Sequence, residues 1–317
     1  MTPQFDYMIN APKIVKKISI LCLLLVFNPI QATEVSINVA IVYLDTNTAY
    51  KNLFATIIRG IEEDKRISTS YYKHGINSNP QDLSSWLEKM KPDVVVALGQ
   101  ASNDLISNLS LKIPVVSSAV TKPDKQHGCI CLNSEPGQLF GKLVELKPDI
   151  KRIIYVHHKN NNAWLIPIAS TVSKRLGINL ELHPVSTLRE AALQYKKILD
   201  SPLTSSDAIW LPLDSAIPGE VILPEILKSA WSKRFIIFSS NPYHVKRGGL
   251  FALFPDYHAL GKQIADISTQ IKDEDNQLVR ISPLLTRSAI NIRTARHLSL
   301  KINNRLINKH DLVFPNK

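Results

Sequence analysis

The sequence predicts an α/β protein with two doubly wound, Rossmann-like lobes. Short, continuously apolar runs such as VVVAL (Val94–Leu98) alternate with longer amphipathic runs, the pattern of parallel strands covered by helices on both faces. The alternation begins at Ile37 and starts again at Pro136, which indicates two such units. The chain has 317 residues and is 44% hydrophobic, enough for two domains with sizeable cores.

The first 32 residues are predicted to be an export signal. Lys13, Lys16 and Lys17 form a basic region, ISILCLLLVF (Ile18–Phe27) follows as an apolar run, and Ala32 suits signal-peptidase cleavage. That run is far shorter than the ~20 residues that a membrane-spanning helix needs. We therefore expect cleavage after Ala32 and a periplasmic protein, with an uncleaved N-terminal anchor as the alternative.

The first lobe is predicted from strands and helices in strict alternation. Leu53, Ile57, Ile58 and Ile61 recur at helical spacing and indicate the first helix. Strands are expected at Ile37–Leu44, Thr69–His74, Val94–Leu98, Ile113–Ala119 and Cys129–Leu132, and helices at Ala49–Lys65, Asp82–Met90 and from Ala101.

The second lobe repeats the pattern, and a shorter third series completes the chain. Helices are expected at Pro136–Leu146, Ala163–Leu176, Leu188–Leu199 and Ile217–Trp231, and strands at Arg152–His158, Ile178–His183, Asp207–Leu213 and Phe235–Ser240. The third series consists of a strand at Gly249–Phe254, a helix at Asp256–Ile271, a polar loop at Lys272–Asn276, a strand at Ser288–Ile292 and a short helix from Thr294.

The chain is basic, with 38 Lys and Arg against 27 Asp and Glu and a net charge of +11. We take these basic residues to be scattered, and no basic stretch is interleaved with aromatic residues, so no nucleic-acid partner is expected. Solvated lysines are the simplest interpretation. An anionic ligand or a membrane surface is the alternative.

Cys129 and Cys131 are the two cysteines of the mature chain. On a strand their side chains share one face with Cα atoms ~6.7 Å apart, at the edge of disulfide geometry. His127 has the same parity, so a soft metal site is one alternative, but no fourth ligand is evident. We expect two small side chains that pack on a strand, and no metal or other cofactor.

The candidate ligand site is taken from the residues that follow the strands, because ligands of open parallel sheets bind beyond the carboxyl ends of the strands. These residues are small hydroxyls, amides, a few aromatics and two aspartates, which suits hydrogen bonding to a small polar ligand. The candidates are Tyr43, Asp45, Thr46, Gly99, Gln100, Ala101, Ser102, Ser118, Asn162, Trp164, Asp214 and Ser239.

The segment Gly99–Ser102 follows the most apolar strand and raises a specific question. It lacks both GxGxxG and a P-loop motif, which argues against a nucleotide phosphate. A helix that begins near Ala101 would offer free N–H groups and its positive dipole end to one ligand carboxylate, with Gly99 allowing close approach. The alternative is an ordinary strand–helix turn in which Ser102 caps the helix.

Catalysis is not expected, because the chain has no GxSxG, HExxH or CxxC motif. An enzyme would have to use Asp45 and Asp214 with His157 or His158. Adjacent strand residues point in opposite directions, so at most one of these two histidines could face a site.

Several segments, in this order along the chain, carry a family resemblance: VVVALGQAS followed by IPVVSSAVTKPD, then DAIWLPLDSAI, LKSAWSKRFIIFSS, VKRGGLFALFPDYHALGKQIADI and INIRTARHLSL. Together they resemble the substrate-binding proteins of ABC transporters of the tryptophan/tyrosine-binding type, over nearly the whole mature chain. The departures are the segment Lys122–Lys125, the cysteines within His127–Leu132, and the asparagine-rich loop Lys159–Asn162. These departures bear on which ligand is bound.

The resemblance implies the type I periplasmic binding protein fold, in which three crossover segments join two lobes and a hinge closes them on a ligand. Lobe 1 would comprise about 33–133 plus 244–275, and lobe 2 about 134–243 plus 276–317. The implied partner is an ABC permease, and we expect a monomer. The alternative is a module of the same fold that reports ligand state to a membrane signalling protein.

The resemblance also implies roles for individual residues, since the family's ligands include aromatic amino acids. Gly99–Ser102 and Ser118 would surround a carboxylate, and Asp214 would lie near an ammonium group. Tyr43 or Trp164 would pack on the ligand side chain.

Overall fold

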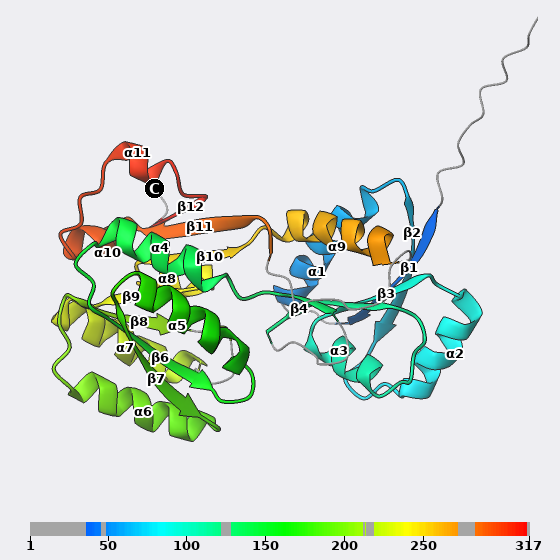
Figure 1. The fold of residues 1–317 in the computed structure, drawn as a ribbon, viewed down its shortest axis with the longest axis horizontal. Coiled ribbons are helices and arrows are strands. Elements are labelled where there is room, and N and C mark those ends of the chain that lie inside the picture. The colour runs from blue at the N-terminus through cyan, green and yellow to red at the C-terminus, as the bar shows by residue number, and fades with distance from the viewer. Residues whose placement is uncertain are drawn as a thin grey trace, which may run out of the picture. The chain divides into compact units, whose positions relative to one another are not determined.

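The computed structural model describes residues 36–45, 49–121, 128–211, 213, 219–271 and 283–315, which form two β-sheets with helices on both faces (Figure 1). Both sheets belong to one compact unit, residues 35–317. Alternating strands and helices in two sheets confirm the predicted α/β class. Among the described residues, no helix is both long and apolar enough to cross a membrane.

The first sheet is entirely parallel, with strand order β2-β1-β3-β4-β5. Because each strand runs the same way, the carboxyl ends of β1, β3 and β4 meet at one edge. Its elements are β1 (Ile37–Leu44), α1 (Ala49–Glu62), β2 (Ile67–His74), α2 (Pro80–Met90), β3 (Val94–Leu98), α3 (Gln100–Ser107), β4 (Val115–Val120) and β5 (Gly128–Cys131).

Helices bury both faces of this sheet, which explains why its central strand is apolar at every position. One face of β1 and β3 packs with Phe54, Ile57 and Ile61 of α1. The other face packs with residues of α2 and α3, including Leu83 and Ile106. All five residues of β3 are completely buried, as the continuous apolar run predicts.

The second sheet has strand order β12-β11-β10-β9-β8-β6-β7, and only the β10–β11 pair is antiparallel. Helices again cover both of its faces. Its elements are α4 (Pro136–Leu146), β6 (Arg152–His158), η1 (Ala163–Leu165), α5 (Ile166–Arg175), β7 (Asn179–Val185), α6 (Leu188–Asp200), β8 (Asp207–Leu211), α7 (Gly219–Lys233), β9 (Ile236–Ser239), α8 (Pro242–Arg247), β10 (Phe251–Pro255), β11 (Thr286–Asn291), α10 (Ile292–His297), α11 (Asn304–Ile307) and β12 (Leu312–Phe314).

The core of the second sheet contains a run of stacked aromatic rings. The ring centroids of Tyr155 and Trp210 lie 4.0 Å apart with an interplanar angle of 15°. Phe238 continues the stack and leads to Phe251, 5.5 Å away between centroids. These rings come from four neighbouring strands, so they join β6, β8, β9 and β10 into one core.

The segment Gly249–Ile271 differs from the expectation that it completes the first lobe. Its strand β10 pairs with β9, and the N–H of Leu250 donates to the carbonyl of Ile237 at 2.7 Å. Its helix α9 (Tyr257–Ile271) instead packs against α1 and the core of the first sheet. The chain therefore passes between the two sheets within this segment, after the strand rather than before it.

The helices α1 and α9 approach closely because glycines face one another at their contact. A Cβ atom on Gly261 would lie 2.1 Å from the carbonyl oxygen of Ile57 and 2.8 Å from the Cα of Gly60. No side chain fits at this point, so the two glycines permit the contact.

The cysteines also differ from the expectation of independent packing. Cys129 and Cys131 form a disulfide, with Cα atoms 5.7 Å apart, on the edge strand β5. The Cα spacing is shorter than in a fully extended strand, which brings the two sulfur atoms within bonding reach. His127 lies outside the described residues. Within the described part, no cluster of three or more His, Cys, Asp or Glu could hold a metal ion.

Candidate functional site

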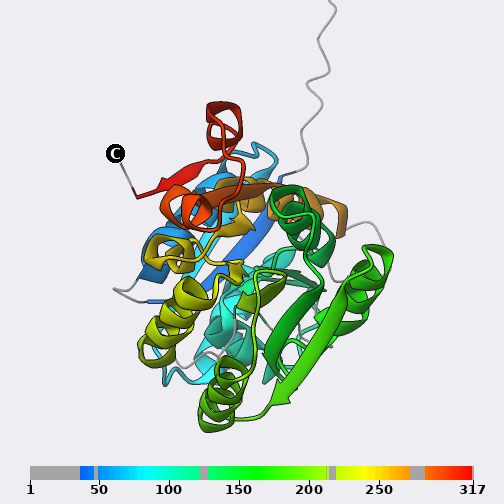
Figure 2. The same cartoon turned by 90° about the vertical axis from the view of Figure 1, so that its left-hand side faces the viewer.

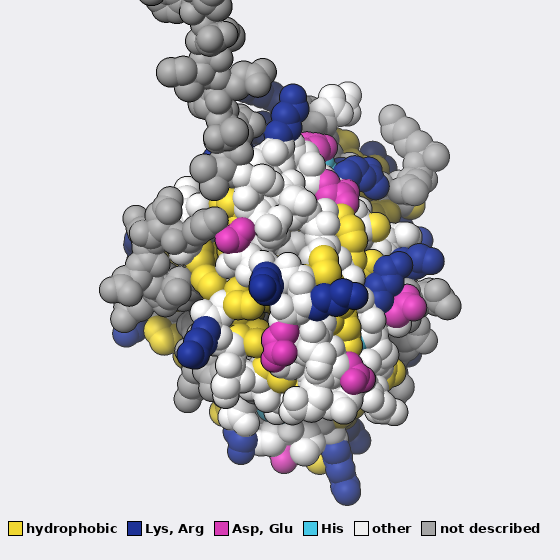
Figure 3. Space-filling view, turned by 90° about the vertical axis from the view of Figure 1, so that its right-hand side faces the viewer, with side chains coloured by type: hydrophobic (Ala, Val, Ile, Leu, Met, Phe, Trp, Pro, Cys, Tyr) yellow, Lys and Arg dark blue, Asp and Glu magenta, His cyan; other side chains and the backbone are white. Residues whose placement is uncertain are grey.

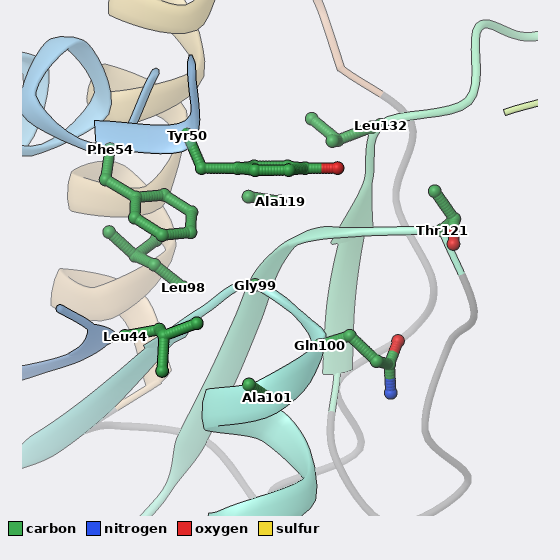
Figure 4. Close-up of a pocket in the computed structure, with 10 residues that line it drawn as sticks. All are labelled: Leu44, Tyr50, Phe54, Leu98, Gly99, Gln100, Ala101, Ala119, Thr121 and Leu132. Carbon is green, nitrogen blue, oxygen red and sulfur yellow. The ribbon is translucent and has the colours of Figure 1, made fainter. Parts of the chain in front are cut away.

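A pocket of about 220 Å³ lies at the carboxyl ends of the strands of the first sheet (Figure 4). Leu44 ends β1, Leu98 ends β3, and Leu132 directly follows β5. This is the edge at which the strand-end rule predicts a ligand site. The described residues that line it are Leu44, Tyr50, Phe54, Leu98, Gly99, Gln100, Ala101, Ala119, Thr121 and Leu132.

Two aromatic side chains from α1 form one wall of the pocket. Tyr50 and Phe54 are one helical turn apart, and their ring centroids lie 6.1 Å from each other. Figure 4 shows the Phe54 ring directed from α1 toward Gly99 and the Tyr50 ring extending toward Leu132, with Gln100 and Thr121 at the other side. Tyr50 is 55% exposed although it is aromatic. An exposed aromatic ring beside a hollow is a ready surface for an apolar ligand group.

Gly99 connects β3 to α3 in a backbone conformation that other residues rarely adopt. Its φ is +85° and its ψ is 163°, and its N–H donates to the carbonyl of Ser118 at 2.9 Å. A Cβ atom at this position would lie 2.9 Å from Cζ of Phe54. Glycine is therefore required both by the backbone conformation and by the neighbouring pocket wall.

The first turn of α3 points its N-terminal end at the pocket. The helix begins at Gln100, and both Gln100 and Ala101 line the pocket. Among the described residues, no side chain makes a capping hydrogen bond at this end of the helix, where Gly99 is the N-cap. The first N–H groups of a helix have no acceptor within the helix, and they carry its positive partial charge. This end of α3 can thus donate hydrogen bonds to an anionic group.

Two buried hydrogen bonds attach the first turn of α3 to strands β2 and β4. Ser102 is fully buried, and its hydroxyl lies 2.9 Å from Nε2 of His74. His74 Nδ1 donates to the carbonyl of Gly75, so Nε2 is the acceptor in the bond from Ser102. The next residue, Asn103, accepts a hydrogen bond from Ser117. Ser102 therefore anchors α3 to the end of β2 and does not cap the helix.

Ser118 is likewise buried rather than exposed to the pocket. Its hydroxyl donates to the carbonyl of Ile130 on β5 at 3.3 Å. The next residue along β4, Ala119, has a φ of +57° at an irregularity in the pairing of β4 with β5. This left-handed conformation is uncommon for a residue with a side chain, and Ala119 lines the pocket.

The remaining candidates on the first sheet lie beside the pocket. Tyr43 is half-buried at the end of β1, and its ring centroid lies 6.3 Å from that of Phe54. Asp45 is exposed just beyond the same strand. Two other candidates, Thr46 and Asp214, lie outside the described residues.

Three candidates lie at or shortly after the ends of strands of the second sheet. Asn162 is fully buried and accepts a hydrogen bond from Nδ2 of Asn133 at 3.3 Å. Trp164 in η1 is half-buried and packs against the cluster of Val120 and the cysteines. Ser239 is buried at the end of β9 and donates to the carbonyl of Leu211.

His244 is a buried neighbour of Ser239 that the strand-end rule does not select. Its Nδ1 lies 2.8 Å from Oγ of Ser239, whose hydroxyl proton goes to the carbonyl of Leu211, so the histidine donates this bond. Burial lowers the pKa of His244 to about 4. His244 is therefore neutral at pH 7.

The pocket itself carries no formal charge on the described side chains that line it. Tyr257 of α9 packs against the same core, and burial raises its pKa, with further repulsion from Tyr50. The phenol of Tyr257 is therefore neutral at pH 7. Among the described residues that line the pocket, the walls are apolar and the polar groups are neutral, so the first amides of α3 provide positive potential for a ligand.

His157 and His158, which an enzyme would have to use, do not line this pocket. His157 stacks on Tyr155, with ring centroids 5.2 Å apart. His158 has Nε2 3.1 Å from the carbonyl of Ser186 and accepts a bond from the N–H of Asn160 at Nδ1. Both imidazole rings therefore interact with residues in or next to the strands of the second sheet.

Several pocket residues were not among the candidates, most notably Tyr50 and Phe54. Helical spacing predicts that apolar residues of an amphipathic helix face the core, and Phe54 does so as well as lining the pocket. A usable signal is the pair of aromatic residues four positions apart in the first turns of the helix after β1. Residues there lie at the same edge of the sheet as the strand ends.

Two sheets wrapped by helices and a pocket at the strand ends define a protein with the type I periplasmic binding protein fold. A family model described as ABC transporter substrate binding protein matches residues 57–313. Since this match spans most of the chain, the protein belongs to the ABC transporter substrate binding protein family. No curated protein matches the sequence significantly.

Solved structures of several bacterial proteins share this fold at low sequence identity. A conserved domain protein from Vibrio cholerae is 18% identical, with 88% of this chain and 99% of that chain covered and a TM-score of 0.59. An ABC domain from Streptococcus pneumoniae in complex with L-Trp is also 18% identical, with 88% and 100% covered and a TM-score of 0.59. The ligand-free, open structure of a substrate-binding protein with adhesive properties from Clostridium difficile is 14% identical, with 87% and 99% covered and a TM-score of 0.64.

Proposed function

We propose that the protein is an exported solute-binding protein that captures a small carboxylate ligand and delivers it to an ABC permease. The observation that carries this proposal is the pocket at the strand ends, where the uncapped first turn of α3 meets the aromatic wall of α1. Family membership supports the delivery role. The basic and apolar segments before Ala32 support export to the periplasm.

The ligand class that fits this pocket best is an amino acid with an aromatic or large apolar side chain. The N–H groups at Gln100 and Ala101 would bind the carboxylate, and the rings of Tyr50 and Phe54 would pack on the side chain. The pneumococcal relative of the same fold was solved with L-Trp, which agrees with this class. Asp214 remains our proposed partner for the ligand ammonium group.

We further propose that the two lobes close on the ligand about a hinge. Lobe 1 keeps 33–133 and α9, whereas lobe 2 starts at 134 and takes β10 from the range first assigned to lobe 1, in line with the sheet pairing of that strand. In the closed state Asn162, Trp164 and Ser239 would complete the site from lobe 2. Ligand favours closure only through a higher affinity for the closed state.

Calorimetric titration of the mature protein with the common amino acids tests this proposal. We expect one ligand per chain and a preference for aromatic or large apolar side chains. Replacing Phe54 with Ala removes part of the pocket wall and should weaken binding, whereas exposed Leu193→Ala on α6 should not. A protein that binds no amino acid, peptide or nucleoside under saturating conditions contradicts the proposal.

A further inference from the structure

The net charge of the chain is concentrated in two stretches. Residues 226–255 and 287–310 contain eleven Lys and Arg and no Asp or Glu. The whole chain carries a net charge of +11, so the other residues are balanced in charge. The basic residues are therefore not scattered, contrary to the interpretation from their spacing along the sequence alone.

The two stretches pack against each other in the second sheet. The guanidinium of Arg234, after α7, donates to the carbonyl of His297 and the hydroxyl of Ser299, both at 2.8 Å. The Nδ2 of Asn291 donates to the carbonyl of Val245 at 2.9 Å. Figure 2 shows this side of the molecule, where the orange α10 lies next to the yellow segments that precede it. The charges of both stretches thus add on one region of the surface.

Within the part of the chain that the structure describes, most of these cations have no acidic partner at ion-pair distance. Of the eleven, only Arg287 is in an ion pair between described residues, with Asp311. Arg247, Arg293 and Arg296 are exposed on α8 and α10. On the face drawn in Figure 3, by contrast, Lys and Arg are interspersed with Asp and Glu.

Two exposed aromatic side chains lie among these cations. Trp231 and Tyr243 are each 42% exposed. The guanidinium carbon of Arg293 lies 5.4 Å from the ring centroid of Trp231, and that of Arg247 lies 5.9 Å from Tyr243. His297 stacks on Trp231 with centroids 3.7 Å apart, which holds the ring in place.

We propose that this basic, aromatic surface, centred on Trp231, Tyr243, Arg247, Arg293 and Arg296, binds the anionic headgroups of a lipid membrane. Basic residues near an anionic bilayer are attracted to its negative surface potential. Aromatic rings with a polar tip favour the headgroup region, where one end is apolar and the other wet. An acidic protein would be recognised mainly through ion pairs and would not need exposed aromatic rings. The combination of cations without acidic partners among the described residues and exposed Trp and Tyr therefore favours a membrane.

Co-sedimentation of the full chain with lipid vesicles tests this proposal. One set of vesicles contains phosphatidylcholine alone, and the other contains equal parts of phosphatidylcholine and phosphatidylglycerol. The test variant is Arg247→Gln/Arg293→Gln/Arg296→Gln. The matched control removes the same charge from exposed positions elsewhere, as Lys89→Gln/Lys112→Gln/Lys196→Gln.

We expect binding to the anionic vesicles that weakens as salt is added, and little binding to the neutral ones. Each basic residue near such a surface contributes about fivefold in affinity, so the triple arginine variant should bind roughly 100-fold more weakly. The control variant should lose far less. Unfolding curves that match wild type would show that both variants fold.

Other outcomes overturn the proposal. Equal losses in the two variants would mean that only net charge matters. Binding to neutral vesicles that neither variant changes would assign membrane affinity to the apolar N-terminal segment. Binding to polyglutamate that the arginine variant loses, without binding to anionic vesicles, would assign the surface to an acidic protein.

Discussion

Replacing Gly99 with Ala perturbs the pocket at its most constrained residue. The backbone at Gly99 has φ +85° and ψ 163°, a region that is nearly restricted to glycine. The added Cβ would also lie 2.9 Å from Cζ of Phe54, so the ring must move. Phe54 is part of the pocket wall and of the first core. The substitution therefore affects both stability and the shape of the pocket.

The expected loss of stability follows from these two effects. A residue with a side chain in such a backbone region costs about 1–3 kcal/mol. Inserting a methyl group against a packed ring costs a further ~1–3 kcal/mol, partly relieved if Phe54 turns. We expect Gly99→Ala to lower the free energy of unfolding by about 2–4 kcal/mol, and to weaken ligand binding as the ring moves into the pocket.

Urea unfolding and calorimetric titration measure the two effects. The matched control is Gly141→Ala on α4, because Gly141 is exposed and a Cβ there has nothing within 4 Å. Alanine in a helix interior should stabilise the control by about 0.5–1 kcal/mol. A Gly99→Ala variant with wild-type stability and affinity would refute the account of this turn.

Three further changes have defined outcomes. Gly261→Ala should destabilise the protein by more than about 2 kcal/mol in urea unfolding, because its Cβ would lie 2.1 Å from a carbonyl oxygen of α1, and unchanged stability would contradict the close helix contact. Burial lowers the pKa of His244 and His310 to about 4 from the ordinary 6.5. As the pH falls, these histidines become protonated in the unfolded chain before they do in the folded protein. The free energy of unfolding should therefore decrease between about pH 6.5 and pH 4, by up to ~3 kcal/mol for each histidine. Urea unfolding at about pH 6.5 and at about pH 4 measures this decrease, which should be smaller in the His310→Phe variant. If the variant has the same pH dependence as wild type, His310 does not contribute to it. Thiol titration of the denatured mature chain should find no free thiol before reduction and two after it, from Cys129 and Cys131, and two free thiols before reduction would rule out the disulfide.

Local sequence patterns were enough to predict both sheets, but not the place of every strand. A run of five apolar residues such as Val94–Leu98 is only stable with both faces buried, so it identifies a central parallel strand. The run Gly249–Phe254 has the same character and would fit either sheet. Its position is set by the pairing of β10 with β9 and by the bond between Leu250 and Ile237, contacts with another strand that the spacing within the run does not reveal.

The site was predictable in part for a related reason. The strand-end rule located Gly99, Gln100 and Ala101, all of which line the pocket. It could not tell which polar side chains face the pocket, and the hydroxyls of Ser102 and Ser118 form internal hydrogen bonds instead. The direction of a side chain is set by packing in three dimensions, which the order of residues does not contain.

Native mass spectrometry of the gently purified mature protein, followed by release of any bound molecule, tests the central claim most directly. We expect one small carboxylate per chain, reduced or absent in the Gly99→Ala variant and retained in Gly141→Ala. A protein that carries no ligand, and whose melting temperature does not change with any of a broad set of metabolites, would contradict the claim that the turn at Gly99 binds a ligand carboxylate.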